Sequence, residues 1–260
     1  MKFKTKLQVP GYQSYTRNRT DKSQGGIATC IIQSESEDCL KVTEGKDSNE
    51  FMITRHSQFV TPINVINVYG EQEGRTAKNV IEDHWNEIVK IEAREEHVII
   101  LADLNRHLPC LKEMNHGKVS AGGKIVEEFI DNNDYVLLNN TPFMQNAYTR
   151  TDPSDPENDS KKSVLDLIIM CKNLSKYVES IVLDKERKFT PSHTNKKNKI
   201  TYPDHYAILM TMKGIPLKKK KQKKEPKILM WNTNKDGGWS KYNRITSDNK
   251  VLNQIAKNFQ

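Results

Sequence analysis

The sequence has few cysteines, and this shortage narrows the class of protein. Four cysteines occur among 260 residues, at positions 30, 39, 110 and 171, and none forms a CxxC pair. Their spacing argues against a disulfide framework and favours reduced thiols that pack inside an intracellular protein. His107, Cys110 and His116 lie close together in the sequence, but their spacing matches no usual zinc knuckle.

Long apolar runs are also missing. No stretch approaches the roughly 20 apolar residues that span a bilayer, and the basic start lacks the apolar core of a signal peptide. We therefore expect no membrane association and a location in the nucleus or cytoplasm, and no obligate protein partner is evident from the sequence. Hydrophobic residues make up only 35% of the chain, yet β-branched and aromatic runs recur through most of its length, so the body is expected to fold.

Charge is concentrated rather than spread. The formal net charge is +8, and the run from 218 to 224 contains six lysines, so the remainder carries only +2. Such a run is typical either of a solvated linker or of a phosphate-binding or nuclear-targeting segment, and both interpretations stay open for Lys218, Lys219, Lys220 and Lys221. DNA binding by the rest of the chain would require a local basic patch.

Hydrophobic periodicity predicts one α/β domain over residues 1–217, a lysine-rich linker over 218–227 and a further segment over 228–260. A helix is predicted over 76–92 and a second from 120. Strands are predicted over 27–32, 63–69, 98–101, 135–138, 164–170, 178–183 and 206–212. The apolar run at 98–101 is typical of a central strand that is covered on both faces, and 150–162 and 190–201 are expected to be polar loops.

Three scattered elements together indicate a site that cleaves a phosphodiester. Asp103 and Asn105 follow the strand at 98–101, where open α/β sheets usually carry ligand-binding groups, and in an extended segment they would point the same way. Asp166 lies in an apolar strand and needs a partner, for which His205 is the economical choice. Asp204 would then point to the other side, toward a metal ion or water. Mg²⁺ suits such oxygen ligands.

The ordered combination resembles the endonuclease/exonuclease/phosphatase superfamily, specifically the apurinic-endonuclease-like domain of non-LTR retrotransposons. The resemblance spans roughly residues 11–212. It rests on Asn67-Val68-Tyr69, Ala102-Asp103-Leu104-Asn105, Tyr148-Thr149-Arg150, Ser163-Val164-Leu165-Asp166 and Pro203-Asp204-His205. The fold that it implies is a four-layer α/β sandwich, in which two packed mixed sheets are flanked by helices.

The resemblance also implies a role for each matching residue. Tyr69 would contact the scissile phosphate, Asp103 would orient or deprotonate water, and Asn105 would hold the nucleophile and the phosphate. Asp166 would orient His205, and Asp204 would serve the metal ion, Mg²⁺ or Mn²⁺. A DNA-facing surface would include Thr149, Arg150 and Ser163.

The sequence departs from the family pattern in three places. The family begins with a strand that carries an Asn and a helix whose Glu is the main metal ligand, and neither precedes Gly11-Tyr12 here. We therefore expect the first strand and helix to be missing and the metal to bind weakly, if at all. Ala102 replaces the usual Gly, and Pro203 replaces the usual Ser.

Three functions follow as hypotheses. The leading one is a Mg²⁺-dependent DNA endonuclease of a retrotransposon, which nicks target DNA and whose activity is in question because the Glu is absent. The second is a non-catalytic nucleic-acid-binding remnant, and the third is a small-molecule phosphodiesterase or phosphatase of the same fold. Residues around Trp231 and Trp239 look like a linker toward a reverse transcriptase, which argues against the third.

Overall fold

A computed structural model describes residues 9–18, 26–41, 51–70, 88, 95–189, 192–194 and 200–219. The chain divides into two units, residues 1–218 and 219–260, and of the described residues only Lys219 belongs to the second. Within the described part, no helix is both long enough and apolar enough to cross a membrane. The expected segment at 228–260 and most of the lysine run lie outside the described residues.

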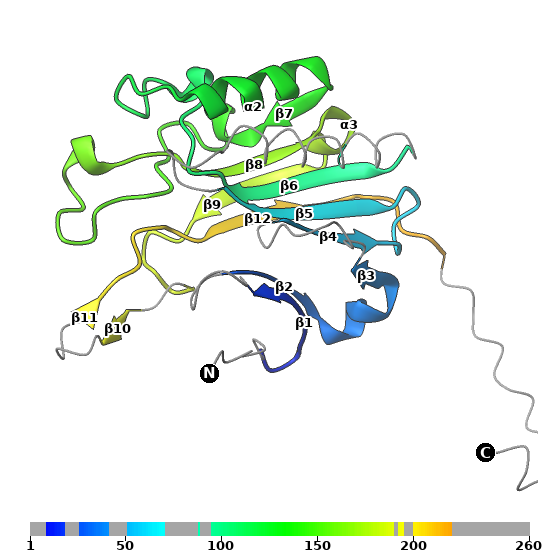
Figure 1. Ribbon diagram of the computed structural model, residues 1–260. Helices are drawn as coiled ribbons and strands as arrows, with labels where there is room; N and C mark the ends of the chain where they lie inside the picture. Colours follow the sequence, from blue (N-terminus) through cyan, green and yellow to red (C-terminus); the bar gives the residue numbers. More distant parts are fainter. Residues whose placement is uncertain are drawn as a thin grey trace, which may run out of the picture. The chain divides into compact units, whose positions relative to one another are not determined.

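The centre of the first unit is a six-stranded mixed sheet (Figure 1). In spatial order its strands are β3 (Cys39–Lys41), β4 (Phe51–His56), β5 (Ile63–Tyr69), β6 (His97–Asp103), β8 (Asp166–Cys171) and β7 (Tyr135–Leu137). Strands β5 and β6 are parallel, and every other neighbouring pair is antiparallel. Alternation explains the two-sided core, because successive residues of β6 and β8 pack into different apolar clusters.

Helix α2 (Ala121–Asn132) covers one face of this sheet (Figure 1). Ser120 caps it, because its hydroxyl accepts a hydrogen bond from the Gly123 backbone N–H. Val126, Phe129 and Ile130 recur at helical spacing and are buried against the sheet. Burial of this apolar stripe therefore fixes α2, and with it the chain that leads into β7.

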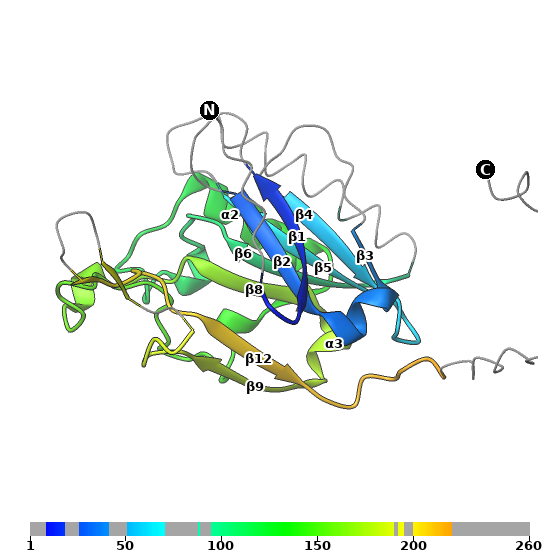
Figure 2. The same ribbon diagram turned by 90° about the horizontal axis from the view of Figure 1, so that it is seen from below.

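The opposite face carries a second layer of strands (Figure 2). The antiparallel pair β9 (Val178–Leu183) and β12 (Ile208–Met212) packs there together with the single-turn helix α3 (Lys172–Ser175). The antiparallel pair β1 (Tyr12–Asn18) and β2 (Gly26–Ile32) is tied to β5, because the Asn67 side-chain amide donates to the Ala28 carbonyl at 2.9 Å.

The remaining elements are short. They are the 3₁₀ segments η1 (Gln33–Asp38), η2 (Pro109–Leu111), η3 (Leu138–Asn140) and η4 (Asp159–Lys161), and the two-residue strands β10 (His193–Thr194) and β11 (Ile200–Thr201). The latter two pair with each other within the segment that was expected to be a polar loop, so that expectation was wrong in part.

The expected α/β sandwich is confirmed, with differences in detail. Among the described residues the second layer consists of separate two-stranded pieces rather than one sheet. Leu101 is 38% exposed, so β6 is not covered on both faces along its whole length. Of the predicted helix over 76–92, only Ile88 lies within the described residues, and it is helical and buried. The four cysteines are free, as expected.

Candidate active site

Strand register aligns three side chains at one edge of the central sheet. Tyr69 and Asp103 are the last residues of the parallel strands β5 and β6, and they are paired in register. Asp103 is in turn paired with Asp166, the first residue of the antiparallel strand β8. Because paired residues in adjacent strands point to the same face of a sheet, the three side chains emerge in a row on the face that carries the second layer.

The turn after Asp103 is fixed by contacts with the end of β5. The Gly70 backbone N–H donates to the Asp103 carbonyl at 2.7 Å, and Nδ2 of Asn105 donates to the Gly70 carbonyl at 2.9 Å. Gly70 has no room for a side chain, because a Cβ would lie 2.3 Å from the Leu104 carbonyl oxygen. Asn105 has φ +49°, so the expected extended geometry was wrong, and its amide braces the turn.

Asp166 is held from behind by two buried side chains. Thr149 Oγ1 accepts hydrogen bonds from the backbone N–H groups of Leu165 and Asp166, at 3.0 and 3.1 Å. Asn139 donates through Nδ2 to the Asp166 carbonyl and accepts through Oδ1 from Ile168, both at 2.9 Å. Thr149 is fully buried, so its expected place on a DNA-facing surface was wrong.

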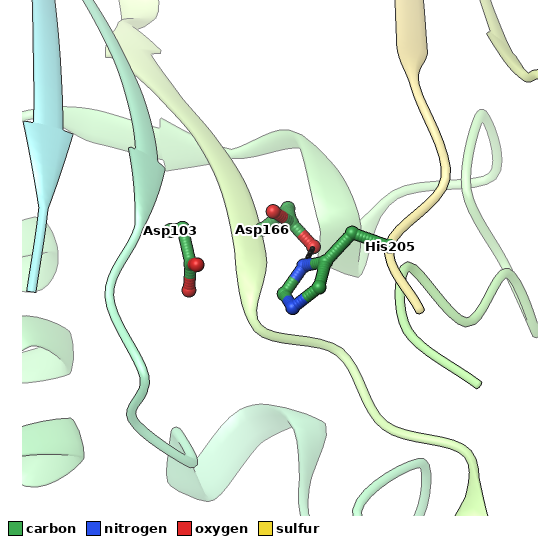
Figure 3. A group of neighbouring side chains, drawn as sticks. All are labelled: Asp103, Asp166 and His205. Carbon is green, nitrogen blue, oxygen red and sulfur yellow. Dashed lines mark hydrogen bonds and ion pairs between the residues drawn. The ribbon is translucent and has the colours of Figure 1, made fainter. Parts of the chain in front are cut away.

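His205 completes the group from the segment between β11 and β12. Its Nδ1 donates to Oδ2 of Asp166 at 2.8 Å, and Figure 3 shows the imidazole directed at that carboxylate, with Asp103 on the other side of Asp166. Burial disfavours the charged imidazole, but the hydrogen bond from His205 to Asp166 and the charges of Asp166 and Asp103 outweigh it and raise the pKa of His205. The predicted Asp–His pair is therefore present in the structure.

Asp103 faces a negative neighbour rather than a partner. Burial, followed by the charge of Asp166, raises the pKa of Asp103 from 3.8 to about 6, although His205 and the Asn105 backbone N–H act in the opposite direction. One ligand atom from each of Asp103, Asp166 and His205 lies within 4.8 Å of the others. Two carboxylates and an imidazole this close together form a donor set that a divalent cation fits, since a cation would relieve the repulsion between the carboxylates.

Asp204 lies beside this group but has a different partner. Nε of Arg150 donates to its Oδ2 at 2.9 Å, and both side chains are close to half exposed. Burial works against the Asp204 carboxylate, but the hydrogen bond from Arg150 and the charge of His205 outweigh it and lower its pKa. Asp204 was predicted to serve a metal ion. The structure instead pairs it with Arg150, and the described residues that converge are Asp103, Asp166 and His205.

The other predicted DNA contacts differ in accessibility. Ser163 is 8% exposed, and its backbone is paired with Arg150, so the expectation that it lines a DNA-facing surface was wrong. Lys218 and Lys219 are exposed, whereas Lys220 and Lys221 lie outside the described residues. Sequence reasoning missed Asn139, because nothing in the Asn139-Asn140 pair distinguishes a buried backbone clamp from a surface turn.

A known family pattern and several solved structures resemble this chain. The sequence pattern of a family described as endonuclease-reverse transcriptase matches residues 63–208, which is more than half of the chain. No curated protein sequence matches the chain.

Solved structures show the same fold at low identity. The endonuclease domain of TRAS1, a telomere-specific non-LTR retrotransposon, is similar with a TM-score of 0.53 and 11% identity, over 78% of this chain and 81% of that one. The AP endonuclease LMAP from Leishmania major is similar with a TM-score of 0.59 and 13% identity, over 80% and 72%. A mannosyl-6-phosphatase from Bacteroides thetaiotaomicron gives 0.50 and 11%, over 79% and 78%.

The family match covers the strand ends that carry Tyr69, Asp103 and Asp166, together with His205, and the solved structures share the α/β sandwich. The chain belongs to the endonuclease-reverse transcriptase family, within the endonuclease/exonuclease/phosphatase superfamily.

Proposed function

We propose that this chain is a DNA endonuclease that nicks its target by hydrolysing a phosphodiester with the help of a divalent cation, Mg²⁺ or Mn²⁺. The observation that carries the proposal is the hydrogen-bonded Asp166–His205 pair with the Asp103 carboxylate beside it on the paired strand. The description of the matched family as an endonuclease supports a nuclease over the phosphatase alternative. The fold alone does not decide this, since a sugar phosphatase shares it.

The cation would be held by the carboxylates of Asp103 and Asp166. Both offer oxygen atoms, which Mg²⁺ prefers, and a bound cation would offset the repulsion from Asp166 that, after burial, raises the pKa of Asp103. When bound, the cation supplies positive charge to the phosphate.

The protein's own groups divide the remaining work. The carboxylate of Asp103 accepts a proton from the attacking water. His205, with its raised pKa, stabilises negative charge that develops on the phosphate or the leaving oxygen, while Asp166 holds the ring in one orientation. Asn105 braces the turn that carries Asp103, and Tyr69 contacts the phosphate from the end of β5.

Arg150 is the best-placed cation for the DNA backbone. Its Nε donates a hydrogen bond to Asp204, and its side chain is 42% exposed. Its backbone pairs with that of His205 in an isolated β-bridge. A guanidinium in this position is suited to phosphate, because its planar set of donors matches phosphate oxygens. Lys218 and Lys219 add exposed charge, so binding should weaken as salt rises.

Nicking of supercoiled plasmid tests the function. The wild-type chain should convert plasmid to the nicked form with Mg²⁺ or Mn²⁺ and lose this activity in EDTA. His205→Ala should lose about 100-fold or more, the usual range for a positioned acid–base group. His97→Ala is a matched control, because His97 begins the same strand that Asp103 ends, and it should keep activity within about threefold.

Two outcomes would contradict the proposal. If His205→Ala nicks as fast as the wild-type chain, the cleavage comes from elsewhere. If the wild-type chain binds DNA and does not cleave it with either metal ion, the chain is a non-catalytic binding protein.

A further inference from the structure

The segment that carries His205 is anchored on one side by the chain around Thr149. The Thr151 backbone N–H donates to the Asp204 carbonyl at 2.9 Å, and the Tyr206 N–H donates to the Thr149 carbonyl at 2.8 Å. These two bonds restrain the backbone on that side only. The position of the imidazole therefore also depends on what holds the other side of the segment.

Arg187 contacts that other side. Its Nη1 donates to the Pro203 carbonyl, and its guanidinium carbon lies 4.6 Å from the centre of the Tyr206 ring and 5.9 Å from that of Tyr202. A guanidinium over an aromatic face is an attractive cation–π contact. Arg187 thus contacts residues on both sides of the Asp204-His205 dipeptide, namely Tyr202 and Pro203 before it and Tyr206 after it. The carbonyl that it binds belongs to Pro203, one of the departures from the family pattern.

Arg187 lies in a turn that several hydrogen bonds hold in place. The Asp184 carboxylate, which is 7% exposed, accepts from the Lys188 N–H at 2.9 Å and from the Phe189 N–H at 2.6 Å. The Asp184 N–H donates to the Ala207 carbonyl at 2.9 Å, so this turn is fastened to the chain just after His205. Arg187 has φ +57°, a strained value for a non-glycine residue that the surrounding contacts must sustain.

We propose that Arg187 is a positioning residue that fixes the backbone on which His205 stands, so that the imidazole is already aligned before the substrate arrives. This inference rests on the proposed function for its catalytic consequence. Small displacements of a reacting group are costly, because alignment contributes much of the rate. A side chain that only sets alignment should act on kcat and leave substrate binding nearly unchanged.

Steady-state nicking of an oligonucleotide duplex separates this role from direct contact with DNA. Arg187→Met keeps the aliphatic stem but loses the donor and the charge, and should lower kcat about tenfold with KM within about twofold. Arg187→Lys keeps one donor and the positive charge, and should stay within about threefold of the wild-type kcat. Lys185→Met removes a charge from the same turn at an exposed position and should change neither constant by more than about twofold.

The opposite pattern would overturn the proposal. If Arg187→Met raises KM with kcat unchanged, Arg187 is a phosphate contact. If Lys185→Met lowers kcat as much as Arg187→Met does, the effect is one of general charge.

Amide hydrogen exchange followed by NMR tests whether Arg187 holds the His205 segment, and it needs no cleavage assay. In Arg187→Met the Tyr206 and Thr151 amides should exchange about tenfold faster, whereas the His97 amide, bonded to Pro62 at the far end of the sheet, should be unchanged. Unchanged Tyr206 and Thr151 amides would overturn the positioning role. If the wild-type chain does not nick DNA, the proposed function fails, and these amides still decide whether Arg187 holds the His205 segment.

Discussion

The two ends of strands β5 and β6 both carry partly buried charge, but the charge is neutralised at one end and concentrated at the other. At one end, the Glu96 carboxylate accepts three hydrogen bonds. Nε and Nη2 of Arg55 donate to it at 2.9 and 2.5 Å, and Nδ2 of Asn64 donates at 2.8 Å. At the other end, Asp103 and Asp166 lie side by side, and among the described residues His205 is the side chain that balances their charge. The first arrangement neutralises a charge and the second concentrates charge of one sign.

The difference separates a structural pair from a functional one. A carboxylate that is removed from water is tolerated when a guanidinium and an amide satisfy it, and it then joins β4 and β5 to the start of β6. Burial and the facing carboxylate of Asp166 together raise the pKa of Asp103, which costs stability, and such a shift is characteristic of catalytic sites. Substitutions at the two ends should therefore change activity and stability in different directions.

The largest expected effect is on activity at the site end. Asp103→Asn should lower kcat for plasmid nicking by about 100-fold or more, because the proton acceptor is lost. Glu96→Gln, which makes the same carboxylate-to-amide change at the other end, should stay within about threefold when the assay is run well below its melting temperature. Equal losses in the two variants would mean that the ends do not differ in function.

The next largest expected effect is the loss of stability when the Arg55–Glu96 pair is broken. Glu96→Ala should lower the free energy of unfolding by about 3 kcal/mol, because it leaves the Arg55 guanidinium without its carboxylate. Urea unfolding measures this. Glu179→Ala is the matched control, since the Lys213–Glu179 pair is exposed and should contribute less than about 1 kcal/mol. A similar loss in both variants would contradict the distinction between the partly buried pair and the exposed one.

The sequence predicted the strands of this comparison well, and in the layer that covers them it also located β9 to the residue. The β-branched run Ile63–Tyr69, which Gly70 stops, defined β5 to the residue, and the apolar run at 98–101 located β6. Strands β1 and β3 were missed because β1 is polar and β3 is only three residues long, so their pairing with neighbours defines them. Strand β4 was also missed, although its first four residues are buried and its apolar start could have indicated it. Short strands depend on tertiary contacts more than on local propensity.

The site was predicted to a similar degree. The Asp166–His205 pair followed from the cost of an unpartnered carboxylate, and it is present. The ion pair between Asp204 and Arg150 could not be foreseen, because it depends on a bridge between segments 55 residues apart in sequence. Thr149 gave no signal of its burial, since a hydroxyl beside an arginine looks the same whether it faces water or a backbone N–H.

The buried clamp behind Asp166 provides the third test. Thr149→Val replaces the hydroxyl that accepts from the Leu165 and Asp166 N–H groups with a methyl of similar size, and should lower the free energy of unfolding by about 2 kcal/mol. Thr149→Ser keeps the hydroxyl and should recover about half of this loss. Urea unfolding compares the two, and a Ser variant no better than Val would show that packing, not hydrogen bonding, is the reason for the threonine.

The smallest expected effect is a gain in stability, rather than a loss, when Asp103 is replaced by asparagine. The pKa of Asp103 is raised to about 6 from 3.8, so the folded chain holds this proton more tightly than the unfolded chain does. The resulting stability is present below the unfolded pKa and is lost as the pH rises through the folded pKa. The full shift corresponds to ~3 kcal/mol, which partial access to solvent screens to about 1 kcal/mol. In EDTA, Asp103→Asn should therefore be about 1 kcal/mol more stable than the wild-type chain near pH ~7.5, and the gain should shrink toward zero near pH ~4. Thermal unfolding across this pH range measures the difference in stability. A gain that grows toward acid would mean that the fold stabilises Asp103 as a carboxylate, as it does Glu96. The two ends of the sheet would then not differ in how they stabilise charge.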